Sequence, residues 1–293
     1  MSKPYVILVV SVIAASFSSI FIKLCEAPSL SIAFYRLLFT TLILLPLMVF
    51  KPDVVKEIRG ISRSDLLMMI IIGFVLSLHF SFWITSLTYT SVASSVILVT
   101  SHPILVAPVA HLFYKEYLSL RNIAGIAISI LGVILLVSGE YTVAESSFIG
   151  DSLAFLGGLA AGLYILGGRR MRKKVSIVSY GVVVYASGSV TMLIICLLFN
   201  SPLINLRVKD YIIILIMAFI SGILGHTLYN WSLAYIRASV ASVSLLGEPI
   251  VSSLLAYIIP SIHQEPTVFA IIGGCAILVG IYLTTRDQAY TMR

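Results

Sequence analysis

The sequence predicts an all-α integral membrane protein whose ten transmembrane helices form two inverted five-helix repeats. Of its 293 residues, 59% are hydrophobic and only 11% are charged, whereas soluble domains carry about 25% charged residues. The mean hydropathy is +1.08, so the folded surface is suited to lipid rather than to water. Ten separate apolar runs and an internal repeat at half the chain length supply the rest of the prediction.

The ten runs each approach the 20 or so residues that a helix needs to cross the hydrocarbon core. They cover residues 4–24, 31–50, 65–86, 91–113, 121–138, 148–168, 178–199, 209–233, 238–259 and 267–284. No sizeable soluble domain remains between them. The first run is expected to be a retained span, because its apolar stretch is longer than that of a typical signal peptide.

The basic residues predict the orientation of these spans. Fifteen of the 19 Lys and Arg residues fall in connections on the side of the N-terminus, and only Lys23, Arg207 and Lys209 fall on the other side. Because cytoplasmic loops are enriched in Lys and Arg, both termini are expected to be cytoplasmic, in a multi-pass protein of the plasma or inner membrane. The net charge of +7 then reflects topology, and no nucleic-acid partner is expected.

Motifs for cofactor chemistry are missing from the sequence. The three cysteines, Cys25, Cys196 and Cys275, are far apart and show no metal-binding or redox spacing. There is no Walker A, HExxH or GxSxG sequence. We therefore expect neither a cofactor nor an enzymatic activity, and any work that the protein does must be driven by an ion or solute gradient, with a proton as a candidate ion.

The internal repeat has an offset of 146 residues. The stretch from Leu87 to Ile104 resembles the stretch from Leu233 to Ile250, and both end in a late proline. This predicts two halves, residues 1–145 and 146–293. With five spans in each half the second copy is inverted in the membrane, which is a common architecture of secondary transporters with a site near the bilayer midplane.

Several short motifs in order resemble the drug/metabolite transporter superfamily, and within it the EamA-type group of ten-helix members. They are Phe34-Tyr35-Arg36-Leu37-Leu38, Leu87-Thr88-Tyr89-Thr90-Ser91-Val92-Ala93, Pro103, Lys115-Glu116 and Gly247-Glu248-Pro249. The resemblance covers essentially the whole chain. It implies two inverted five-helix repeats around a central cavity, and transport of amino acids, their derivatives, nucleosides or other metabolites, often as export. One departure is that His102 stands where the second repeat has Glu248.

Ionisable residues inside the spans are the first candidates for a substrate site, because a charge at the helix centre costs about 2.5–3.5 kcal/mol on insertion scales. Glu248 precedes Pro249 in the ninth span and is a candidate for binding a proton or an ammonium group. Arg36 in the second span is a candidate for binding a carboxylate or a phosphate. The alternatives are a protonated Glu that locks two helices together, and an Arg in a structural ion pair.

Matched polar and aromatic positions in the third and eighth spans are further candidates. His79 and Trp83 are four residues apart and share a helix face, as do His226 and Asn230. Tyr164 in the sixth span is the last candidate for substrate binding. The alternative for the histidines and Asn230 is helix–helix hydrogen bonding, and for Tyr164 it is packing against lipid.

Three other features are interpreted more plainly. Glu116 and Glu265 follow the fourth and ninth spans at comparable repeat positions; they are interpreted as ordinary loop charges, with gate contacts as the alternative. The basic run at residues 169–174 is interpreted as a topology signal, with contact to anionic lipid as the alternative. Gly273, Gly274 and Gly280 are candidates for a helix interface between chains, and the oligomeric state stays open.

The sequence hypothesis is a secondary active transporter, and an exporter, of a small polar metabolite that works by alternating access, with amino acids or their derivatives first. Its partners would be the substrate, the bilayer and a coupling proton. The alternatives are a flippase or carrier for an amphipathic lipid-linked solute, and a membrane-embedded enzyme, which would need paired carboxylates or a metal set that the sequence lacks.

Overall fold

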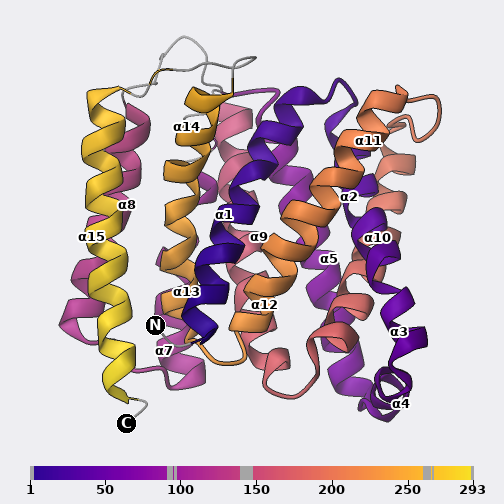
Figure 1. Ribbon diagram of the computed structural model, residues 1–293, viewed down its shortest axis with the longest axis horizontal. Helices are drawn as coiled ribbons and strands as arrows, with labels where there is room; N and C mark the ends of the chain where they lie inside the picture. The colour runs from indigo at the N-terminus through magenta and orange to yellow at the C-terminus, as the bar shows by residue number, and fades with distance from the viewer. Residues whose placement is uncertain are drawn as a thin grey trace.

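The computed structural model describes residues 3–90, 95, 98–138, 148–259, 265 and 267–291. All regular elements in this part of the chain are helices, most of which stand side by side in one bundle (Figure 1). The first half contains α1 (Lys3–Leu24), α2 (Ser29–Leu44), α3 (Pro46–Phe50), α4 (Pro52–Gly60), α5 (Arg63–Ser86), α7 (Pro103–Tyr114) and α8 (Leu120–Ser138). The second contains α9 (Phe148–Arg172), α10 (Ile177–Leu198), α11 (Val208–Met217), η2 (Ala218–Thr227), α12 (Leu228–Ser232), α13 (Ala238–Ser244), η3 (Leu245–Gly247), α14 (Glu248–Ile258) and α15 (Val268–Thr291).

The predicted membrane fold is confirmed. Eight helical segments of the described chain are long and apolar enough to cross a membrane. Two shorter apolar helices, α7 and the Leu120–Leu136 part of α8, occupy the places of the predicted fourth and fifth spans. Most of the beginning of the fourth span, residues 91–94 and 96–97, lies outside the described residues, as does the predicted boundary between the repeats at residue 145.

Two spans of the second half are irregular in ways that the sequence did not predict. The eighth span runs through α11, η2 and α12, and η2 is a π-helix of ten residues. The ninth span runs through α13 and α14, which are separated by the 3₁₀ turn η3 directly before Glu248. Because π and 3₁₀ segments within helices are frequent at functional sites, both breaks make the middle of the bundle the first place to look for a functional site.

The packing of the helices follows the internal repeat. With an offset of 146 residues, α1 corresponds to α9, and α5 corresponds to the eighth span. The extensive contact of α5 with α9 therefore has its counterpart in the contact of η2 with α1, while α2 packs on α10 and α8 on α15. Both termini lie at one end of the bundle (Figure 1). This arrangement is expected for two related halves in opposite orientation.

The contact between α8 and α15 depends on glycines. A Cβ atom at Gly280 would lie 2.5 Å from the carbonyl oxygen of Gly125, and one at Gly273 would lie 2.5 Å from that of Gly132. Such close approach of two helix backbones is possible only without side chains. Gly273 and Gly280 are thus used inside the chain, so the predicted use of these two residues between chains is wrong.

Candidate functional site

Arg36 is the central residue of the site. It lies on α2 with only 1% of its surface exposed, and neither Nη1 nor Nη2 has a hydrogen-bond partner. Its guanidinium carbon lies 4.3 Å from the centre of the Phe80 ring on α5, a cation–π contact. An aromatic face satisfies none of the five N–H donors of a guanidinium. The arrangement therefore leaves a buried cation with free donors, which is costly unless a ligand or a counter-charge compensates it.

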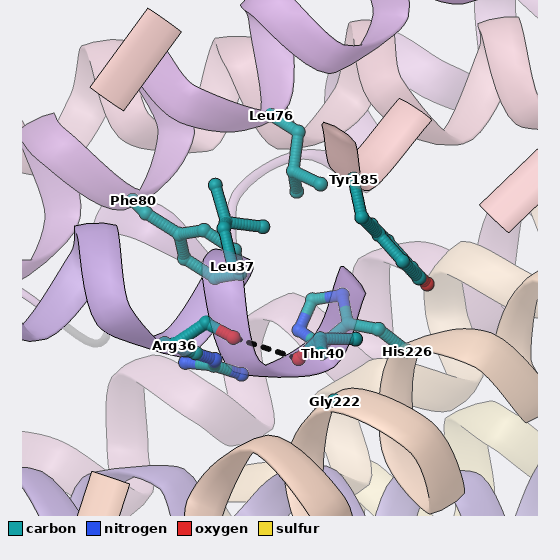
Figure 2. Close-up of a pocket in the computed structure, with 8 residues that line it drawn as sticks. All are labelled: Arg36, Leu37, Thr40, Leu76, Phe80, Tyr185, Gly222 and His226. Carbon is teal, nitrogen blue, oxygen red and sulfur yellow. Dashed lines mark hydrogen bonds between the residues drawn. The ribbon is translucent and has the colours of Figure 1, made fainter. Parts of the chain in front are cut away.

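A cavity adjoins the guanidinium, and Figure 2 shows the side chains that surround it. Its volume is about 10 Å³, close to the roughly 10–15 Å³ that a single water molecule needs, so the cavity is closed to a solute in this conformation. It lies between helices of both halves. The lining residues are Arg36, Leu37, Thr40, Leu76, Phe80, Tyr185, Gly222 and His226.

The π-helix η2 brings its backbone close to α2 at this cavity. A Cβ atom at Gly222 would lie 2.3 Å from Oγ1 of Thr40, so only glycine allows this approach. Thr40 Oγ1 donates to the Arg36 carbonyl at 2.7 Å, the bond drawn in Figure 2. Thr227 Oγ1 donates to the Gly222 carbonyl at 3.0 Å, five residues back. The irregular helix thus shapes one wall of the cavity.

His226, Asn230 and Tyr164 form a connected group beside the cavity. The His226 ring lies edge-on to Phe80 with 5.3 Å between ring centres, and 6.2 Å from the ring of Tyr164. The Asn230 amide donates to the His226 carbonyl at 2.7 Å and to the Tyr164 hydroxyl. Asn230 is fully buried, and its Oδ1 has no partner. The group therefore offers a free acceptor one helical turn after His226, which lines the cavity.

His79 and Trp83 stack on one another on α5, with ring centres 5.9 Å apart and planes at 10°. His79 Nδ1 is 2.9 Å from the Gly157 carbonyl oxygen on α9, while the buried Nε1 of Trp83 has no partner. Neither residue lines the cavity itself. Through the neighbouring Phe80 ring, which lies 5.0 Å from that of His79, they are next to its wall.

Glu248 lies outside the cavity lining but within electrostatic reach of Arg36. It is half-buried at the first position of α14, directly after the break in the ninth span. Among the described side chains Glu248 forms no direct ion pair with Arg36, so its charge can influence the guanidinium only from a distance. His102, its counterpart in the first half, is buried and bonded to Ser242 Oγ at 2.7 Å. The two halves therefore place different chemistry at equivalent positions.

The structure brings the seven sequence candidates into one region, and it places Arg36 and His226 on the cavity itself. Phe80, Tyr185, Thr40 and Gly222 were missed by sequence reasoning. Phe80 follows His79 directly, and Thr40 lies one helical turn after Arg36, so their positions carried a signal. Tyr185 and Gly222 carried none, because only the folded bundle shows that they face the same space.

The interpretation of Glu116 as an ordinary loop charge is wrong. Glu116 is buried and accepts from Nε of Arg169 at 2.8 Å. Arg169 and Arg172 are buried too, although both belong to the basic run that was interpreted as a topology signal. Glu265, the residue at the comparable repeat position, is exposed. The ends of the two halves therefore differ in structure.

Comparison with known proteins identifies the family. The sequence matches the profile of the EamA-like transporter family twice, over residues 2–138 and again over residues 148–286. The chain belongs to the EamA-like transporter family. As an EamA-family protein it is a membrane transporter rather than an enzyme, and it requires a small-molecule substrate and a lipid bilayer.

Relatives of this EamA-family chain extend over its length. It is 24% identical over 294 residues to an uncharacterized transporter of Archaeoglobus fulgidus, covering 98% of this chain and 99% of the relative. It is 25% identical to the uncharacterized transporter YyaM of Bacillus subtilis, covering 76% of this chain and 75% of YyaM. A solved crystal structure aligns with a TM-score of 0.76 over 97% of this chain and 98% of its own, at 15% identity, and shows the shared fold.

Proposed function

We propose that this EamA-family protein is a secondary transporter that exports a small polar metabolite by alternating access, with amino acids and their derivatives first among the candidate substrates. The observation that supports the proposal most strongly is the buried guanidinium of Arg36, whose free Nη1 and Nη2 adjoin a cavity inside the bundle. Free, pre-positioned donors of this kind suit a carboxylate, which accepts two parallel bonds from a guanidinium.

The neighbouring groups fit the remainder of an amino acid. Glu248 is proposed to bind the ammonium group of the substrate or a coupling proton, because it is a carboxyl group inside the ninth span, at the break between α13 and α14. Asn230 Oδ1 and Trp83 Nε1 are buried and without partners, and they are proposed to bind polar atoms of the solute. His79, Tyr164 and His226 are proposed to complete the walls of the site.

Alternating access is supported by the origin of the lining residues. Arg36 and Phe80 come from the first half, whereas Tyr185 and His226 come from the second. A rocking motion of one half against the other would therefore open the same site to either side. The direction of transport, export, is proposed from the family resemblance. Both termini are proposed to be cytoplasmic, in the plasma or inner membrane, because the basic residues gather at the end of the bundle that carries the termini.

A counterflow screen tests this function. Purified protein in liposomes is loaded with unlabelled amino acids, nucleosides or sugars, and labelled members of each pool are then supplied outside. We expect exchange with the amino-acid pool, competed by its own members and lowered by Arg36→Ala. Exchange with another pool only would reject amino acids as substrates, and flux unchanged by Glu248→Gln at every pH would reject the coupling role of Glu248.

A further inference from the structure

A second buried charge cluster lies at the end of the bundle that carries the termini, away from the Arg36 cavity. Its centre is Glu116, in the connection between α7 and α8. Arg169 Nε donates to Glu116 Oε1 at 2.8 Å, and the amide of Ala238 donates to Glu116 Oε2 at 2.8 Å. Arg169 also donates through Nη1 to the carbonyl of Leu233 at 2.7 Å. One carboxylate thus joins three segments of the chain.

The turn after α7 is built to direct Glu116 inward. Lys115 adopts a left-handed conformation with φ of 54°, and its amide and that of Glu116 both donate to the carbonyl of Ala110. A left-handed residue of this kind closes a helix and reverses the chain direction. The Glu116 carboxylate is therefore turned back toward the bundle, where 5% of its side chain is exposed.

The cluster connects the two halves. Glu116 belongs to the first half, whereas Arg169 and Ala238 belong to α9 and α13 of the second. A further bond across the same boundary runs from Nη1 of Arg237 to the carbonyl of Tyr117 at 2.7 Å. The segment that these bonds fix, from Leu233 to Ala241, includes five fully buried residues, Leu233, Ile236, Ala238, Val240 and Ala241. The contact therefore keeps the beginning of the ninth span packed against the first half.

We propose that Glu116 and Arg169 form a latch that holds the cytoplasmic end of the transporter closed, and that this latch must separate before the central cavity opens to the cytoplasm. The proposal rests on the alternating access and the orientation given under Proposed function. The bonds of the latch cross the boundary at which one half would rock against the other. Because a buried, charge-assisted pair is strong while formed and costly to leave half-formed, it suits a two-state closure.

Thiol labelling tests the latch without any solute. Cys25, Cys196 and Cys275 are first replaced by alanine, and Ser239→Cys is added as a near-isosteric reporter, since Ser239 follows Ala238 and is 2% exposed. Labelling of the purified protein in lipid nanodiscs by a hydrophilic maleimide then reports how often this end opens. We expect Glu116→Gln to raise the labelling rate by about 10- to 100-fold, the factor that the loss of a hydrogen bond to a charged group corresponds to.

Two controls separate opening of the latch from general loosening. Asp65→Asn breaks the exposed ion pair of Asp65 with Lys174, 2.7 Å long at the same end, and is expected to change the rate less than about twofold, as surface pairs contribute little. A second reporter, Ser129→Cys, lies buried between α8 and α15 and is expected to stay unlabelled in Glu116→Gln. If Glu116→Gln does not fold, Arg169→Lys keeps the charge while losing the planar fork, and is expected to raise the Ser239→Cys rate as well.

A Ser239→Cys labelling rate that Glu116→Gln and Arg169→Lys leave within twofold of the parent would overturn the latch. Equal acceleration at both reporters would also overturn it, because the pair would then stabilise the whole fold rather than one end. Neither outcome depends on transport, so a protein that exchanges none of the tested solutes can still show the latch. Conversely, if the protein exchanges a solute but Glu116→Gln leaves the Ser239→Cys labelling rate unchanged, the latch is rejected while the proposed transport function stands.

Discussion

Replacing Arg36 with methionine is expected to stabilise the fold while abolishing transport. Methionine fits the path of the arginine stem and adapts to irregular space. The substitution removes a buried cation whose Nη1 and Nη2 have no partner, and buried ions carry a penalty of several kcal/mol each. It also removes the cation–π contact with Phe80, worth about 0.5–2 kcal/mol. The difference favours the variant by about 1–3 kcal/mol.

Arg169→Met provides the matched comparison, because Arg169 is a buried arginine with its partners in place. Removing one member of a buried pair costs about 3–5 kcal/mol, so this variant is expected to be destabilised. The assay is thermal unfolding in detergent, where each kcal/mol shifts the midpoint by about 2–4 °C. A midpoint for Arg36→Met that falls as far as that for Arg169→Met would refute the reasoning, since Arg36 would then be a structural residue.

Three further predictions follow from other parts of the fold. Gly280→Leu is expected to destabilise the contact of α8 with α15, because the backbone of Gly125 leaves no space for a side chain. Gly60→Ala is expected to be neutral, because a Cβ atom at Gly60 would have no other atom within 4 Å. Thermal unfolding of both variants checks this prediction. Partial burial opposes ionisation of Glu57, but hydrogen bonds from Ser176 and Ser179 outweigh this effect and lower the pKa of Glu57. The ionised carboxylate therefore stabilises the fold above about pH 4.3, and this stabilisation is lost as the pH falls. The difference in unfolding midpoint between wild type and Glu57→Gln is expected to shrink on acidification, and a difference that stays constant would contradict the prediction. Gly222→Val is expected to lower exchange strongly, because its side chain would collide with Thr40, and unchanged flux would show that η2 does not shape the site.

The fold was predictable from the sequence because lipid imposes simple rules. A span must be apolar over about 20 residues, and Lys and Arg gather on one side, so the ends of α1, α5 and α10 agree with the predicted runs to within a few residues. The breaks in the eighth and ninth spans were not predictable in this way. The π-helix η2 depends on tertiary contacts such as that between Gly222 and Thr40, which leave no periodic signal.

The candidate site was predictable where charge was out of place and unpredictable where it was not. Arg36 and Glu248 were found because ionisable residues in a span need an explanation. Tyr185, an ordinary aromatic residue in an apolar helix, gave no such signal. Glu116 was misjudged for the opposite reason: a charged residue in a connection is expected to be solvated, and only the folded chain shows that it is enclosed by α9 and α13.

Equilibrium binding of a transported amino acid and of its carboxamide tests the central claim most directly, measured on wild type and on Arg36→Lys. A hydrogen bond to a charged group contributes about 1.5–3 kcal/mol, and each 1.4 kcal/mol is a factor of ten. If Arg36 binds the carboxylate through two parallel bonds, wild type should bind the carboxamide about 10- to 100-fold more weakly, and Arg36→Lys should discriminate far less. The same discrimination in both proteins would show that the carboxylate binds elsewhere.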